Sequence, residues 1–191
     1  MIDYTSLADK VLRDKEVTRN EALSLLKTSD EDVLELINAA YKIRRCHFGN
    51  TVTIQMLFNA KSGACIEDCN YCSQSSISTA TIDRYALVEP KEMLKAARHA
   101  AESKAQRYCV VISGRSPLDR EIEEISKAVR QIKEELPIQV CCSLGLLTES
   151  QAKLLKAAGV DRINHNLNTS EKYHASICTT HTFQDRLTTL N

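Results

Sequence analysis

Three cysteines, Cys65, Cys69 and Cys72, stand close together at Cys-x3-Cys-x2-Cys spacing and are joined by short polar linkers. Thiolates spaced in this way can occupy three corners of one metal centre. A structural zinc site normally takes four protein ligands, and a [4Fe–4S] cluster is normally held by four thiolates. No further His or Cys follows at short spacing, since the next cysteine is Cys109. The pattern therefore favours a cluster with one iron open to a small molecule over a zinc knuckle that a distant residue completes.

The same loop resembles the signature of the radical S-adenosylmethionine (SAM) superfamily. In that superfamily three cysteines hold a [4Fe–4S] cluster, and the free iron chelates the amine and carboxylate of SAM. Tyr71 stands directly before the third cysteine, where the superfamily places an aromatic residue against the adenine. The resemblance implies an iron–sulfur cluster and SAM, and the loop alone leaves the substrate open.

A polar run, Asn164-His165-Asn166-Leu167-Asn168, falls in and just after a segment expected to be a strand at residues 160–167. In extended backbone the three asparagines point to one face and His165 points to the other. Buried amides need hydrogen-bond partners. Either a polar ligand, such as a ribose or a urea, or backbone groups at the strand end would supply them. His165 is interpreted as a structural histidine.

Further thiols lie in two other expected strands. Cys109 is in the middle of residues 107–113, and the pair Cys141-Cys142 ends residues 138–142. Neighbouring strand residues face opposite sides, so only one of the pair can share a face with Cys109. A second metal site and ordinary small core residues are equally good interpretations, and two thiolates alone do not complete a [2Fe–2S] cluster. Cys178 and Cys46 are interpreted as unligated thiols.

The elements that must position these residues alternate between strand and helix. Periodicity and capping signals predict three helices before any strand, at residues 4–15, from Thr18 through 26, and from 29 or 30 to near Gly49. We expect residues 1–50 to form an N-terminal helical cap. Strands are expected at 51–58, 107–113, 138–142 and 160–167, helices from Pro90, at 119–135 and at 149–158, and a further helix in 182–191.

Strand and helix alternating every 25–35 residues indicate βαβ units and a parallel sheet. Residues 51–191 are therefore predicted to form an α/β domain of the (β/α) TIM-barrel type. Chemistry in such barrels lies at the carboxyl ends of the strands. The three-cysteine loop follows the first strand, so it falls on that face.

Composition narrows the class of protein further. The 191 residues carry 25 lysines and arginines against 25 aspartates and glutamates, so no basic excess points to nucleic acid or to an anionic membrane surface. No apolar run of about 18 residues predicts a membrane span, and no signal peptide is visible. The eight cysteines then indicate a reducing, cytoplasmic setting, where they serve as metal ligands or buried thiols.

Together these segments resemble the biotin synthase family. The similar runs are residues 59–75 around the cysteine loop, Tyr-Cys-Val-Val-Ile-Ser-Gly-Arg at 108–115, Ser-Leu-Gly-Leu-Leu at 143–147, and residues 159–170. The Asn-His-Asn-Leu-Asn-Thr-Ser stretch separates this family from other radical SAM enzymes. The resemblance spans essentially the whole chain and implies a radical SAM (β/α) barrel.

The resemblance implies a second cluster, a [2Fe–2S] centre on Cys109 and Cys141. Cys141 stands four residues before Gly145 and thereby matches the family ligand, whereas Cys142 does not. The residues themselves leave that choice open.

The resemblance also implies ligand contacts. Asn166 and Asn168 fall where the family contacts the SAM ribose, and Asn166 lies near the ureido ring of the substrate. Arg186 matches an arginine near the SAM carboxylate, and Tyr71 completes the SAM site.

The implied reaction is sulfur insertion into dethiobiotin, the last step of biotin biosynthesis. Reductive cleavage of SAM gives a radical that removes hydrogen from an unactivated carbon, and sulfide from the [2Fe–2S] cluster then closes the ring. The implied partners are dethiobiotin, a reduced flavodoxin- or ferredoxin-type electron donor, and a second copy of the chain in a homodimer.

Two departures from the family are visible. Ile66 replaces the usual proline, which we expect to alter loop stiffness more than ligation. The family also continues beyond Asn191, and that part carries a third cysteine and an arginine of the [2Fe–2S] site. We therefore expect a C-terminally truncated barrel of about four to five of the eight βα units. This barrel would be active only when complete. The alternatives are another radical SAM enzyme that uses only the first cluster, and a non-catalytic Fe–S scaffold.

Overall fold

The computed structural model describes residues 3–191, which divide into two compact units, one ending at Val52 and the other running from Thr53 to Asn191. The described part of the first unit holds the helices α1 (Tyr4–Leu12), α2 (Arg19–Leu25) and α3 (Val33–Phe48). These are the three expected helices, although α1 ends three residues before the predicted bound. Their role as a cap stays a prediction.

Local capping explains where the first helices begin and end. The Thr18 hydroxyl accepts a hydrogen bond from the Glu21 N–H, and the Glu21 carboxylate accepts one from the Thr18 N–H, which is the predicted capping box. Lys10 also binds Glu21, and these hydrogen bonds lower the pKa of Glu21 to about 2. Helix α3 ends at Gly49, whose φ is +57°.

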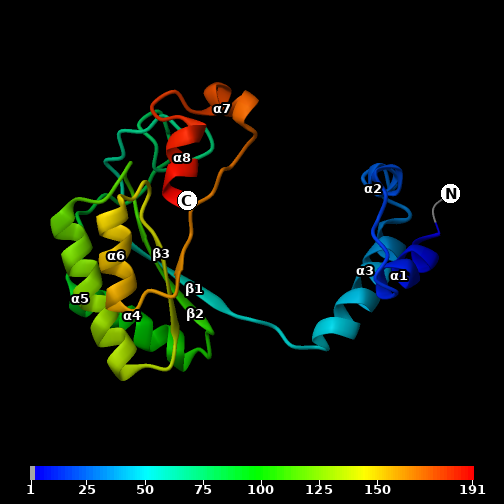
Figure 1. The fold of residues 1–191 in the computed structure, drawn as a ribbon, viewed down its shortest axis with the longest axis horizontal. Coiled ribbons are helices and arrows are strands. Elements are labelled where there is room, and N and C mark those ends of the chain that lie inside the picture. The colour runs from blue at the N-terminus through cyan, green and yellow to red at the C-terminus, as the bar shows by residue number, and fades with distance from the viewer. Residues whose placement is uncertain (1–2) are drawn as a thin grey trace. The chain divides into compact units, whose positions relative to one another are not determined.

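The second unit is built on a parallel sheet of β1 (Gln55–Lys61), β2 (Arg107–Ile112), β3 (Gln139–Ser143) and β4 (Arg162–Ile163), in that order. Helices α4 (Pro90–Glu102), α5 (Asp119–Glu135) and α6 (Glu149–Ala158) connect successive strands and lie along one face of the sheet (Figure 1). This α/β arrangement confirms the predicted βα units of a partial barrel. None of the described helices is both long and apolar enough to cross a membrane.

The helix-covered face of the sheet forms the main core. In β2, Tyr108, Val110 and Ile112 are buried, whereas the residues between them are only half-buried. The Tyr108 hydroxyl donates to the Met93 carbonyl at 3.0 Å, so the one polar atom of this buried side chain has a hydrogen-bond partner. Each large apolar side chain buried here contributes about 1.5–3 kcal/mol. Apolar packing thus occupies one face and leaves the opposite face for polar groups and thiols.

Two strands differ from the prediction by more than one residue. Strand β1 begins at Gln55 rather than at residue 51 and continues to Lys61. Its bounds match those of its partner β2, because Gln55 pairs with Arg107 and Lys61 pairs with Ile112. Strand β4 covers only Arg162–Ile163 instead of 160–167, because it pairs with just Cys141 and Cys142 of β3. The asparagine run lies beyond this strand, and Asn168 at its end has a φ of +65°.

The C-terminal segment contains two helices. Helix α8 (Phe183–Leu190) confirms the helix expected in 182–191, and Thr182 and Asp185 form its capping box. Helix α7 (Glu171–Ile177) was not predicted. Its seven residues offer too few periodic positions for a pattern to show, since only His174 is buried.

Candidate metal centre

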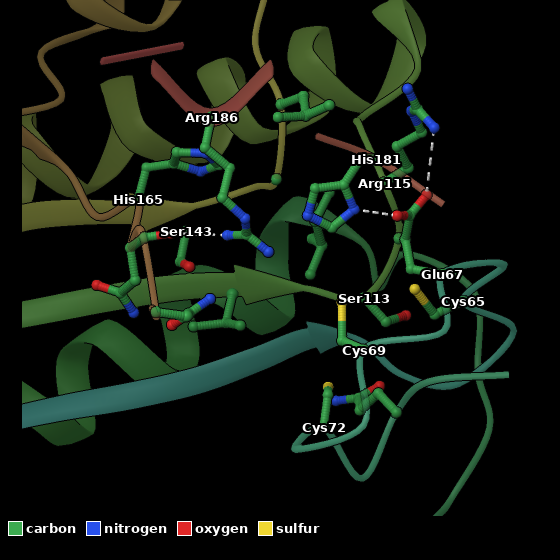
Figure 2. Close-up of a pocket in the computed structure, with 18 of the residues that line it drawn as sticks. Cys65, Glu67, Cys69, Cys72, Ser113, Arg115, Ser143, His165, His181 and Arg186 are labelled. Carbon is green, nitrogen blue, oxygen red and sulfur yellow. Dashed lines mark hydrogen bonds and ion pairs between the residues drawn. The ribbon is translucent and has the colours of Figure 1, made fainter. Parts of the chain in front are cut away.

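A cavity of about 270 Å³ opens at the carboxyl ends of the strands. Loops that follow β1, β2, β3 and β4 line it together with helix α8, as expected for the functional face of a parallel barrel. Figure 2 shows several of its side chains directed into this space. The cavity gathers seven predicted site residues, namely Cys65, Cys69, Tyr71, Cys72, Asn166, Asn168 and Arg186.

The cysteine loop is held at its first turn by side chains rather than by a sheet. The Gln74 side-chain carbonyl accepts a hydrogen bond from the Gly63 N–H at 2.7 Å. The Ser113 hydroxyl, just after β2, donates to the Gly63 carbonyl at 2.7 Å. Later in the loop, the Ser76 N–H donates to the Glu67 carbonyl at 2.8 Å. These contacts fold the loop back on itself so that its thiols face the cavity.

The three thiols of the loop are not gathered around a single point in residues 3–191. Within residues 3–191, Cys65 and Cys72 do not belong to a group whose donor atoms all lie within 4.8 Å. Ligands of one ion must lie that close, whereas cysteines of a cluster bind different irons and stand farther apart. Burial raises the pKa of the Cys69 thiol to about 12, and the neighbouring Cys178 thiol adds to the increase. A thiolate at Cys69 therefore needs a bound cation, which the iron of a cluster would provide.

Beside these thiols lies a polar group assembled from three separate segments. The Tyr71 hydroxyl accepts hydrogen bonds from the Asn168 amide and from the Arg186 guanidinium, the latter at 3.2 Å. Arg186 also donates to the Asn166 carbonyl at 2.7 Å. Burial raises the pKa of Tyr71 to about 12. All four residues line the cavity, as the sequence-based interpretation requires.

Arg186 carries a donor that no group in residues 3–191 uses. Its side chain is buried, and its Nε has no hydrogen-bond partner among the described residues. A buried guanidinium with a spare donor is suited to binding a carboxylate. This orphaned atom fits the carboxylate of a ligand such as SAM.

His165 does not point away from the site, contrary to the prediction. It lines the cavity together with its neighbours Asn164 and Asn166. Burial lowers the pKa of His165, and its Nε2 has no partner among the described residues. His165 is therefore a neutral imidazole within the cavity wall.

Cys109 and Cys141 stand opposite each other in the register of β2 and β3. Cys142 belongs instead to the core beneath the helices. Val111 and Ser143, each two residues beyond this pair, line the cavity. The paired thiols therefore lie on the cavity side of the sheet. Burial raises the pKa of Cys109 to about 12, and the Cys141 thiol adds to it.

Sequence reasoning missed a group built around Cys178. Its Sγ lies 3.6 Å from the Cys69 Sγ and 3.2 Å from the His181 Nδ1. His181 in turn contacts the Glu67 carboxylate, which also faces Arg115 at 3.7 Å (Figure 2). The Cys-x2-His spacing of Cys178 and His181 is short enough for metal ligands, and this signal was available in the sequence.

Hydrogen bonds to Asp68 join the cysteine loop to the segment that follows α7. The Asp68 carboxylate accepts hydrogen bonds from the N–H groups of Thr179, at 2.9 Å, and Thr180, at 3.3 Å, and from the Thr179 hydroxyl. These bonds, that of the Thr179 hydroxyl foremost, lower the pKa of Asp68. This contact, the Asp68 clasp, brings Cys178 and His181 to the cysteine loop.

Comparison with protein families gives one match over most of the chain. The model of the radical SAM superfamily matches residues 60–191. The matched region contains the cysteine loop, all four strands except the first five residues of β1, and the cavity.

Curated relatives are similar along nearly the whole chain. A biotin synthase of Rhodopirellula baltica is 50% identical over 187 residues, which are 98% of this chain and 52% of that protein. Biotin synthases of Lysinibacillus sphaericus and Bacillus licheniformis are each 48% identical, over 99% and 100% of this chain and 57% of their own lengths. The chain thus spans a little over half the length of the relatives it matches.

Solved structures agree on the fold. Methylornithine synthase superposes with a TM-score of 0.82 at 22% identity, over 96% of this chain and 54% of that one. HydG, a maturase of the [FeFe]-hydrogenase, gives a TM-score of 0.72 at 21% identity, over 98% and 42%. These similarities support the fold alone.

Proposed function

Because this chain belongs to the radical SAM superfamily, we propose that it forms the part of a biotin synthase that binds a [4Fe–4S] cluster and SAM. Cys65, Cys69 and Cys72 would hold the cluster. The proposed reaction of the complete enzyme is sulfur insertion into dethiobiotin. Identity of 46–50% with biotin synthases over nearly all of this chain supports that choice.

The observation that carries the proposal is the position of the Tyr71–Arg186 group beside the three thiols in one cavity. The guanidinium of Arg186 would bind the SAM carboxylate through its spare Nε. The amides of Asn166 and Asn168 offer both donors and acceptors to ribose hydroxyls, and Asn166 would also contact the ureido ring of dethiobiotin.

The paired thiols Cys109 and Cys141 would hold a [2Fe–2S] cluster deeper in the barrel. Their register, and the position of Cys142 in the core, support this assignment. Two thiols alone do not complete such a cluster, so two further ligands are needed.

The bound cofactors supply an electron for cleaving SAM, the resulting radical chemistry and the sulfur atom, while the protein positions and shields them. Buried Arg186 and the loops that line the cavity would help to shield that chemistry from water. The proposed electron donor is a reduced flavodoxin- or ferredoxin-type protein, the proposed assembly is a homodimer, and the proposed compartment is the cytoplasm.

Anaerobic reconstitution of the chain with iron and sulfide tests the first cluster. We expect about four irons per chain, a reduced-cluster EPR signal, and a change in that signal when SAM is added. Cys65→Ala, Cys69→Ala and Cys72→Ala should each lose the signal, whereas Cys46→Ala, an exposed thiol of the first unit, should retain it.

Failure of the wild-type chain to bind a four-iron cluster would contradict the proposal. A complete cluster whose EPR signal does not change when SAM is added would favour a non-catalytic scaffold. Joining the chain to the C-terminal part of a relative should give a protein that forms biotin from dethiobiotin. SAM cleavage without biotin would point to another radical SAM reaction.

A further inference from the structure

Cys69, Cys178 and His181 each place one donor atom within 4.8 Å of the other two. All three side chains are buried, with 8%, 3% and 8% of their surfaces exposed. Only Cys69 takes part in the proposed cluster, so Cys178 and His181 have no role in that function. Two sulfurs and an imidazole nitrogen are the donors that zinc prefers.

We propose that Cys69, Cys178 and His181 form a binding site for a single zinc-type divalent cation in the chain that lacks its iron–sulfur cluster. The donors come from two segments that the Asp68 clasp holds together. Three protein ligands leave a fourth tetrahedral position, which is open to water.

The spacing of the donors matches a tetrahedral ion. Zn–S bonds of about 2.3 Å at tetrahedral angles put two sulfur ligands about 3.8 Å apart, and a Zn–N bond of about 2.0 Å puts sulfur and nitrogen about 3.5 Å apart. The Cys69 and Cys178 sulfurs are separated by 3.6 Å. The Cys178 sulfur lies 3.2 Å from Nδ1 and 3.8 Å from Nε2 of His181. The ion would therefore bind with little rearrangement.

Glu67 provides the support that a metal-binding histidine usually has. Its buried carboxylate contacts the His181 Nδ1 and accepts a hydrogen bond from the Thr180 hydroxyl at 2.7 Å. Donation from Nδ1–H to this carboxylate fixes the ring and leaves Nε2 for the ion. The second oxygen of Glu67 has no hydrogen-bond partner among the described residues, and only Arg115 faces it.

Zinc and the proposed cluster would exclude each other, because both need the sulfur of Cys69. The zinc site itself does not depend on the cluster, and only this exclusion rests on the proposed function. The thiols other than the shared Cys69 therefore distinguish the two metal-bound forms: Cys65 and Cys72 belong to the cluster, and Cys178 belongs to the zinc site.

Titration of the anaerobic, cluster-free chain with Co²⁺ and Zn²⁺ tests the site. We expect one ion per chain, with the absorption of tetrahedral cobalt bound by two thiolates. Cys178→Ser should remove about half of the thiolate-to-cobalt absorption, since one of two sulfurs is lost. His181→Ala should weaken zinc binding at least as much as Glu67→Gln, for which about a 10- to 100-fold loss is expected.

Cys65→Ser and Cys72→Ser are the matched controls and should bind zinc as the wild type does. Loss of binding in these controls, or a wild-type cobalt spectrum with three thiolates, would place the ion on the cysteine loop and overturn the proposal. Unchanged binding in Cys178→Ser would overturn it as well. Circular dichroism checks that each variant is folded. If a variant does not fold, the cobalt spectrum of the wild type still distinguishes two thiolate ligands from three.

Iron uptake in the presence of zinc tests whether the two metal-bound forms exclude each other. Zinc added before reconstitution should reduce iron uptake by the wild type and have less effect on Cys178→Ser. A chain that binds zinc as described but never acquires iron would contradict the proposed function and leave the zinc site standing.

Discussion

Tyr71 and Arg186 are 115 residues apart in the sequence, yet the Arg186 guanidinium donates a hydrogen bond to the Tyr71 hydroxyl at 3.2 Å. Asn168 donates to the same hydroxyl. One phenol therefore holds two of the side chains that we propose to bind SAM. Because the bond involves a charged donor, its loss costs about 1.5–3 kcal/mol.

Replacing Tyr71 with Phe should weaken SAM binding about tenfold or more, since each 1.4 kcal/mol is about a factor of ten. Iron content should not change, because the hydroxyl is no cluster ligand. SAM titration of the reduced-cluster EPR signal measures the effect. Tyr85→Phe is the control, as its hydroxyl donates to the Asn59 carbonyl outside the cavity. Equal losses in both variants would rule out the orienting role.

Substitutions at Cys141 and Cys142 test which face of the sheet each thiol occupies. Cys142→Ser puts a hydroxyl into the apolar core, which should lower the free energy of unfolding by about 1–3 kcal/mol. Cys142→Ala should cost less because it leaves no polar group unpaired. Cys141→Ser, on the cavity side, should cost less than Cys142→Ser. Denaturant unfolding of the three variants checks the order, and a more severe effect of Cys141→Ser would contradict the assignment of faces.

The Asp68 clasp should weaken in acid. Hydrogen bonding from Thr179 lowers the pKa of Asp68 below its usual 3.8 in the folded state. The clasp therefore contributes its full stability above the unfolded-state pKa, and loses it as pH falls below about 4 toward the folded value. Wild type and Asp68→Asn should differ in thermal stability at pH 7, and the difference should shrink below pH 4. A difference that is constant with pH would show that ionised Asp68 is not responsible.

Gly145 permits a close approach of two loops at the cavity. Its φ is +80°, and a Cβ there would lie 2.3 Å from the backbone carbonyl oxygen of Arg115. Gly145→Ala should therefore cost well over the ~1 kcal/mol of left-handed strain alone. Gly159→Ala is the matched control, since φ is +101° but the nearest atom is the flexible Lys133 side chain. Thermal unfolding compares them, and equal shifts would contradict the backbone clash.

Elements set by local pattern were predicted well. Helix α5 begins and ends at the predicted residues, because four regularly spaced isoleucines and valines mark its buried face and acidic residues fill its first turn. The capping box at Thr18 and the end of α6 at Gly159 were likewise visible in the sequence. In each case the residues that decide the structure lie within a few positions of it.

Features that depend on distant contacts were not predictable in this way. The length of β4 is set by its two pairs with β3, and no local signal shows that pairing stops after Ile163. The neighbours of Cys178 depend on the Asp68 clasp, which joins segments 111 residues apart. The cluster ligands were predicted from their spacing, and their assignment stays a proposal.

The 111 residues between Asp68 and Thr179 affect the order in which the site assembles. The entropy of closing a loop grows with its length, and the 111 residues between Asp68 and Thr179 are a longer separation than that of any strand pair in the sheet. Contacts of this kind form late in folding and open early. The sheet and its helices should thus be ordered before the C-terminal segment closes over the cysteine loop. Metal insertion during biogenesis would meet a loop that is still accessible, and an ion joining Cys69 to Cys178 would act as a cross-link across that closure.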